Sequence, residues 1–209
     1  LADIHALLNK KGSKDLIKKE VEAWKKTIKA IGIKAEIVLG SDFQFKKEEY
    51  KMLGGMYGGH VVVQIDSLAY GYNFHSGHVH PFARQRKNKM AGLMEKDNAA
   101  EMRQHWRNGT VSIFSIAVTA EQKARLFYIA DSLHKAPAFD YAFFGMRCAA
   151  TGYYLLGQIN VVKKTKHFGS IVKAFHPKQL RRKLVRLAKR KKISVETQSG
   201  SPRRKWEGQ

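Results

Sequence analysis

Two apolar runs separated by a short polar stretch constrain the fold of this 209-residue chain more than any other feature. The first run is His60–Ile65 and the second is Tyr70–His75, with a four-residue loop expected over Asp66–Ala69. Runs of this length, rich in β-branched and aromatic residues and bounded by turn formers, are typical of paired strands. The sequence therefore predicts an antiparallel β-hairpin.

Side chains alternate between the two faces of a strand, so the hairpin sorts its polar residues into groups. On the first strand His60 and Gln64 share a face, and on the second strand Asn73 and His75 share one. We expect Asn73 and His75 to face the same way as His60 when the two strands pair. This face would then hold polar groups that can orient an imidazole.

Periodicity and turn signals predict further elements on both sides of the hairpin. The expected strands are 35–39 and a buried strand at 111–118. Helices are expected at 14–31, from a Thr119–Gln122 capping box to about 134, from near Cys148 to near Gly157, and from Pro177 to about Lys191. Residues 76–108 are expected to form a long irregular excursion that contains one helix around 99–105. The glycine-rich stretch 54–59 lacks the signature of a phosphate-binding loop, and 199–209 is expected to be a disordered end.

The chain is strongly basic, with 39 Lys and Arg against 17 Asp and Glu and a formal net charge of +22. Residues 163–209 carry a net charge of +14 and the rest of the chain +8. Such a charge favours partners that are polyanions, such as an anionic cell-wall polymer, an anionic membrane surface or nucleic acid. Nucleic acid is the less favoured of these, because the basic segment has few aromatic residues and no recognised nucleic-acid motif. The alternative is a solvated basic tail.

Three classes of protein are excluded by composition. A single cysteine, Cys148, excludes an intramolecular disulfide framework and a zinc site built on several thiolates. No apolar stretch reaches the ~20 residues of a membrane-spanning helix. The sequence shows no basic-then-apolar signal peptide, and an export signal that has been removed stays open.

Cys148 is the strongest candidate for chemistry, because it is expected in the first turn of a helix. The positive end of the helix dipole and the free backbone N–H groups there favour the thiolate, which is the nucleophilic form. Arg147 beside it adds positive charge, and the same N–H groups can hold an oxyanion. A thiolate nucleophile also needs a base, and His60 at the head of an apolar strand is the best candidate.

These residues resemble the circularly permuted NlpC/P60 papain-like superfamily of cysteine hydrolases, which includes cell-wall peptidases, lecithin:retinol acyltransferase-like enzymes and YiiX-like proteins. The resemblance lies in Gly59–Ile65 followed by a second strand, and in Tyr141–Ala149 with the cysteine 88 residues after the histidine. It covers roughly 54–157, about half of the chain. It implies an α+β papain-like fold, in which a small antiparallel sheet packs on the cysteine-bearing helix, with extra helices at both ends.

The resemblance also implies the roles of the site residues. Cys148 would be the nucleophile and His60 the base, with His75 or Asn73 as the third polar residue. Contacts to the oxyanion or the substrate would come from Arg147, Tyr141 and Gln64. Arg147 departs from the family, where Asn often precedes the cysteine, and no acidic third residue is present.

Two other interpretations remain open. Together with His60, the histidines His75, His78 and His80 suggest a zinc site, but the catalytic interpretation is preferred because it also accounts for Cys148, so neither a metal nor a cofactor is expected. In the second interpretation the chain is a non-catalytic polyanion-binding protein, with Cys148 in the core.

The sequence thus predicts a hydrolase domain over 1–162 and a basic helical extension and tail over 163–209. The expected activity is that of a cysteine amidase or peptidase acting on peptidoglycan stem peptides. A lipid amide or ester hydrolase or an acyltransferase is the alternative. The expected location is the bacterial cell envelope or the exterior, with the cytoplasm as the alternative.

Overall fold

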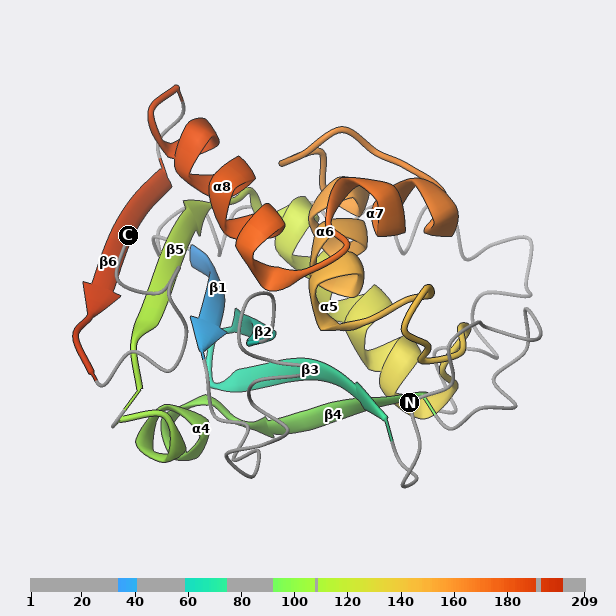
Figure 1. The fold of residues 1–209 in the computed structure, drawn as a ribbon, viewed down its shortest axis with the longest axis horizontal. Helices are drawn as coiled ribbons and strands as arrows, with labels where there is room; N and C mark the ends of the chain where they lie inside the picture. The colour runs from blue at the N-terminus through green and yellow to red at the C-terminus, as the bar shows by residue number, and fades with distance from the viewer. Residues whose placement is uncertain (1–33, 41–58, 75–91, 108, 191–192, 201–209) are drawn as a thin grey trace, which may run out of the picture.

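The computed structural model describes residues 34–40, 59–74, 92–107, 109–190 and 193–200 (Figure 1). Within these ranges the strands are β1 (Lys34–Gly40), β2 (His60–Ile65), β3 (Leu68–Phe74), β4 (Gly92–Asn98), β5 (Val111–Ala117) and β6 (Ile193–Gln198). The helices are α4 (Ala99–His105), α5 (Ala120–Lys135), α6 (Cys148–Gln158), α7 (His167–Lys173) and α8 (Pro177–Ala188).

The strands form one antiparallel sheet in the order β4-β3-β2-β1-β5-β6. This confirms an α+β protein built on an antiparallel sheet. The predicted hairpin is present as β2 and β3, but Ile65 pairs with Leu68, so its turn has two residues and not four. Asp66 takes a left-handed backbone with φ 55°, which is the conformation that tight hairpin turns need at their first position.

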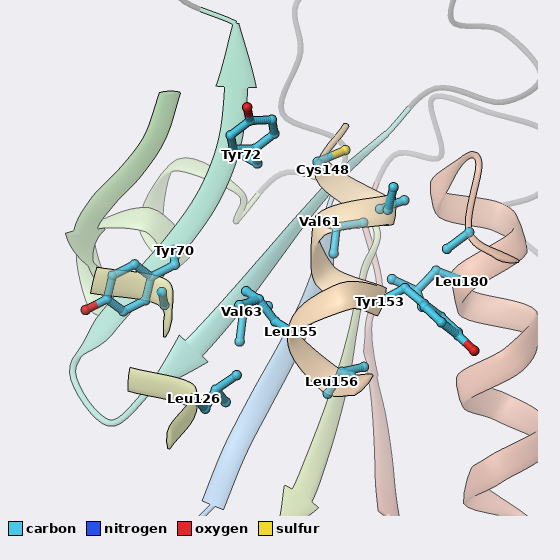
Figure 2. Close-up of a cluster of buried hydrophobic side chains, with 14 of the residues drawn as sticks. Val61, Val63, Tyr70, Tyr72, Leu126, Cys148, Tyr153, Leu155, Leu156 and Leu180 are labelled. Atoms are coloured by element: carbon cyan, nitrogen blue, oxygen red, sulfur yellow. The ribbon is translucent and has the colours of Figure 1, made fainter. Parts of the chain in front are cut away.

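The two faces of the sheet carry different helices. On one face, here called the α6 face, Val61 and Val63 pack in the main core with α5, α6 and α8 (Figure 2). On the other, here called the α4 face, Val62 and Ala69 pack against Trp106 at the end of α4. Alternation along β2 therefore divides its consecutive valines between two cores.

Close packing of α6 on β2 depends on Gly152. A Cβ atom at this position would lie 3.0 Å from Cγ1 of Val61. Without a side chain there, the helix backbone approaches the strand closely. Nearly the whole of α6 is buried, so this contact fixes the position of Cys148 at its start.

Most of the predicted elements within the described residues are confirmed. Strands β1 and β5 and helix α4 lie where the sequence placed them. The capping box of α5 is present, because Thr119 Oγ1 accepts from Gln122 N at 3.1 Å and Thr119 N donates to Gln122 Oε1 at 2.9 Å. Helix α8 begins at Pro177 as predicted but ends at Ala188, and α6 passes Gly157 by one residue.

Two strands and one helix of the structure are not predicted by the sequence. The excursion expected at 76–108 is wrong over Gly92–Asn98, which forms edge strand β4. Edge strand β6 and the seven-residue helix α7 were not expected either. Among the described strands, β4 and β6 each pair with one neighbour, and their sequences are largely polar. In β6 four consecutive residues are exposed, whereas in β4 Met94 is fully buried.

The basic C-terminal segment is built onto the sheet as far as the structure describes it. Strand β6 pairs with β5, and α8 packs against both α6 and β6. The segment that the sequence set apart as an extension from residue 163 thus completes the sheet. The predictions at 14–31, 54–58 and 201–209 lie outside the described residues. None of the described helices is long and apolar enough to cross a membrane.

Candidate active site around Cys148

Cys148 is the first residue of α6, as the sequence predicted. The preceding residue, Arg147, occupies the N-cap position but gives no side-chain hydrogen bond to the helix. The first-turn N–H groups of a helix have no partner within the helix, and the dipole adds positive potential at this end. The sulfur therefore lies at a helix end that is suited to a thiolate or an oxyanion.

In the structure, this cysteine lies beside the start of β2. Cys148 Sγ lies 3.9 Å from the carbonyl oxygen of Gly59, the residue that precedes His60. Gly59 has φ 119°, a backbone conformation that favours glycine. Two segments about 90 residues apart in the sequence thus meet where the helix and the strand both begin.

Tyr141 interacts electrostatically with Cys148. Burial raises the pKa of Tyr141, negative charge on Cys148 raises it further, and Arg147 opposes the rise. Its ring stacks on that of Tyr72 at 5.7 Å and lies at the same distance from the ring of Phe74. The phenol is therefore a neutral hydrogen-bond donor near the thiol, in a wall of aromatic rings.

Arg147 is held by aromatic side chains beside the site. Its guanidinium carbon lies 4.3 Å from the ring centre of Phe175 and 5.0 Å from that of Phe143, and it donates a hydrogen bond to the Phe175 carbonyl. Burial lowers the pKa of Arg147. These contacts anchor the segment before α6 to the loop between α7 and α8.

The His60 ring lies on the α4 face, away from α6. Its centre is 6.1 Å from that of Trp106, edge to face. A Cβ atom at Gly71 would lie 2.9 Å from His60 Nε2, so the ring extends over Gly71. Cys148 belongs to the core on the α6 face. The structure therefore brings the backbone at His60 close to Cys148 but directs the imidazole to the other side of the sheet.

The two amide side chains among the predicted site residues are engaged elsewhere. Asn73 donates to the carboxylate of Glu95 on β4. Gln64 Oε1 accepts from Arg103 Nε at 3.1 Å and Nη2 at 2.8 Å. These contacts join β2 and β3 to neighbouring elements, and they do not involve Cys148.

The histidines of the zinc interpretation cannot be compared with the structure, because His75, His78 and His80 lie outside the described residues. Among the residues that are described, no group of three or more His, Cys, Asp or Glu side chains is arranged to hold a metal ion.

The structure also contains a basic pocket near the C-terminal end of α6, which the sequence did not predict. The pocket has a volume of about 550 Å³ and lies between the residues after α6 and helix α8. The available signal was the run of cations at 163–164 together with those on α8, but only folding brings the two segments together.

Comparison with known proteins gives two short likenesses. Over 48 residues, or 23% of its length, the chain is 50% identical to the tyrosine–tRNA ligase of Methanocaldococcus jannaschii, covering 16% of that protein. It is 46% identical over 48 residues to the corresponding ligase of Methanococcus maripaludis, covering 15%. The chain thus spans about a sixth of each relative, which is too little to assign an activity. No protein-family profile and no solved structure matches the chain.

Proposed function

We propose that this protein is a papain-like cysteine hydrolase that forms an acyl-enzyme on Cys148. One observation carries the proposal: the cysteine begins a buried helix with no side-chain cap, beside the residue that precedes the strand of His60. An apolar core position would account for the burial of the thiol. It would not account for its place at the uncapped end, where ionisation and oxyanion binding are both favoured.

In the proposed reaction the Cys148 thiolate attacks the carbonyl carbon of an amide or ester. A sulfur–carbon bond forms, and the oxyanion is held by first-turn N–H groups of α6. The bond to the leaving amine or alcohol then breaks, and the leaving group takes the proton that the base received from the thiol. Water attacks the thioester, the sulfur–carbon bond breaks and the thiol is regenerated.

The base in this proposal is a histidine, either His60 or His75. His60 begins β2 beside the sulfur, but its ring contacts Trp106 on the α4 face. His75 lies outside the described residues, so its role is tested only by substitution. Separate His60→Gln and His75→Gln variants distinguish the two candidates.

The proposed substrate is a peptidoglycan stem-peptide amide, as the resemblance implies. A lipid amide or ester is the second candidate, and the aromatic residues before α6 favour it. Phe143 and Phe144 are 38% and 52% exposed, and their rings lie 4.9 Å apart. Exposed phenylalanines in the segment that leads into the nucleophile's helix suit an apolar acyl group better than a polar peptide.

Alkylation by iodoacetamide tests the nucleophile directly, because Cys148 is the only cysteine of the chain. We expect the alkylation rate to rise with a midpoint well below pH ~8.5, the value of a free thiol, although burial opposes this. We expect Cys148→Ser to abolish hydrolysis of peptidoglycan fragments or acyl esters while leaving the circular dichroism spectrum unchanged.

The histidine variants complete the test. A loss of at least about tenfold in the rate of hydrolysis in either His60→Gln or His75→Gln supports that histidine as the general base, since general-base catalysis contributes about 10²–10⁴-fold. Two results would refute the proposal: a thiol that titrates at or above pH ~8.5, or hydrolysis that survives in Cys148→Ser.

A further inference from the structure

The pocket between the end of α6 and helix α8 is lined by four cationic residues, and no carboxylate is among the described residues that line it. Lys163 and Lys164 follow α6, and Lys183 and Arg186 lie one turn apart on α8. Within the part of the chain that the structure describes, none of the four forms an ion pair. No ion pair with another described residue therefore neutralises their positive charge.

The fold holds these cations together against their mutual repulsion. A Cβ atom at Gly157 would lie 3.3 Å from the Cα of Lys164, so the lysine pair packs directly on the last turn of α6. Burial lowers the pKa of Lys183, and the positive charges of Lys173 and Arg186 lower it further. An anion in the pocket would relieve this repulsion.

Apolar residues also line the pocket. Tyr153 extends from α6 toward α8 (Figure 2), and Val161, Val162 and Leu187 line the pocket with it. The pocket volume of about 550 Å³ lies within the range of small-molecule sites. It therefore suits a compact anion with several negative charges, attached to an apolar or sugar-like group.

We propose that this pocket binds a diphosphate or phosphomonoester group. Four cations match the two to three negative charges of such a group, and lysine and arginine are the usual phosphate ligands. The group can belong to a soluble phosphorylated molecule or to a phospholipid headgroup. An extended nucleic-acid backbone fits less well, because these cations surround one concavity and do not form a stripe. The proposal does not depend on the chemistry of Cys148.

Calorimetric titration of the full chain with inorganic pyrophosphate tests the proposal. The variant Lys183→Gln/Arg186→Gln removes two pocket cations from α8 and keeps good helix formers there. Lys178→Gln/Arg182→Gln removes the same charge from the same helix, outside the pocket lining. We expect the first variant to weaken pyrophosphate binding at least about tenfold and the second less than about threefold.

Vesicles distinguish the two sources of phosphate. Vesicles of phosphatidylcholine with and without phosphatidic acid, whose headgroup is a phosphomonoester, are titrated in the presence and absence of pyrophosphate. Binding to the anionic vesicles that pyrophosphate displaces indicates a lipid headgroup, and pyrophosphate binding without vesicle binding indicates a soluble molecule. Both results support the pocket.

Three results would overturn the proposal. The first is the absence of pyrophosphate binding, and the second is an equal loss in the two double variants, which would show a general charge effect. The third is a DNA duplex that binds more tightly than pyrophosphate and loses affinity equally in both variants. Circular dichroism and the unfolding temperature of each variant show whether it is folded.

Discussion

A steric contact between His60 and the backbone at Gly71 fixes where the imidazole lies. The missing side chain at position 71 leaves room for the ring on the α4 face, because a Cβ there would lie 2.9 Å from His60 Nε2 and 3.4 Å from Val62 Cγ2. The His60 ring therefore lies on the opposite face of the sheet from the sulfur of Cys148, which belongs to the core on the α6 face.

We predict that Gly71→Ala lowers the free energy of unfolding by about 1–3 kcal/mol, the usual cost of overpacking a core. In a His60→Ala background the same change should cost much less, because the methyl group then enters the space of the ring. Urea unfolding of the two single variants and the double variant measures this coupling. Equal costs in both backgrounds would contradict the position of the ring.

The sequence predicted the grouping of His60 with the polar residues of β3 but not the face on which they lie. Both faces of β2 are apolar, with Val61 and Val63 on one and Val62 on the other. Alternation shows which residues share a face, yet it does not show which face a distant helix covers. Cys148 was easier to place, because the start of a helix is set by local residues.

At the scale of elements, the same contrast between local and long-range information recurs. The capping box of α5 and the proline of α8 are local signals, and both helices begin where these predict. Strands β4 and β6 exist because they pair with β3 and β5, and their own residues are mostly polar. Such edge strands cannot be recognised without the strands that they join.

Asp131 joins α5 to edge strand β4 and gives stability that depends on pH. Its carboxylate accepts from Lys96 Nζ at 2.9 Å and from Lys135 Nζ at 2.7 Å. The hydrogen bonds from Lys135 and Lys96 lower the pKa of Asp131 in the folded protein. A lowered pKa means that the unfolded chain takes up the proton first as the pH falls. The contribution is therefore present above pH ~4 and lost below it.

We predict that Asp131→Asn lowers the free energy of unfolding at pH 7 by about 1 kcal/mol, since its lysine partners are partly exposed. The difference from the unmodified protein should shrink steadily below pH ~4. Urea unfolding at pH 7 and pH 3 measures both values. Asp97→Asn, at an exposed position of strand β4, is the matched control and should change stability by less than about 0.5 kcal/mol. A difference that grows on acidification would contradict the assignment.

At the scale of the whole molecule, the uneven charge opposes folding. Of the net charge of +22, residues 163–209 carry +14 with only two acidic residues. Folding packs α8 against α6 and β6 and places Lys163 and Lys164 opposite it. The compact state therefore concentrates positive charge that the unfolded chain spreads out.

Salt should therefore stabilise this protein. Screening weakens the ion pairs of Asp131 and Asp66, but exposed pairs contribute only about 0–1 kcal/mol each. The repulsion among the cations is the larger effect, because the chain carries 39 Lys and Arg against 17 Asp and Glu, and charges are screened beyond a Debye length of ~10 Å at 0.1 M salt. We predict that raising sodium chloride from ~10 to ~150 mM raises the unfolding temperature by about 2–4 °C, equivalent to about 1 kcal/mol for a chain of this size.

Pyrophosphate separates screening from occupation of the pocket. At equal ionic strength it should raise the unfolding temperature more than chloride does, because binding to the folded state adds RT ln(1 + [L]/Kd) to its stability. The excess should vanish in Lys183→Gln/Arg186→Gln and persist in Lys178→Gln/Arg182→Gln, while the response to chloride changes little in either. Scanning calorimetry over a salt series measures both effects. An unfolding temperature that falls with chloride would show that the ion pairs outweigh the repulsion, contrary to this account.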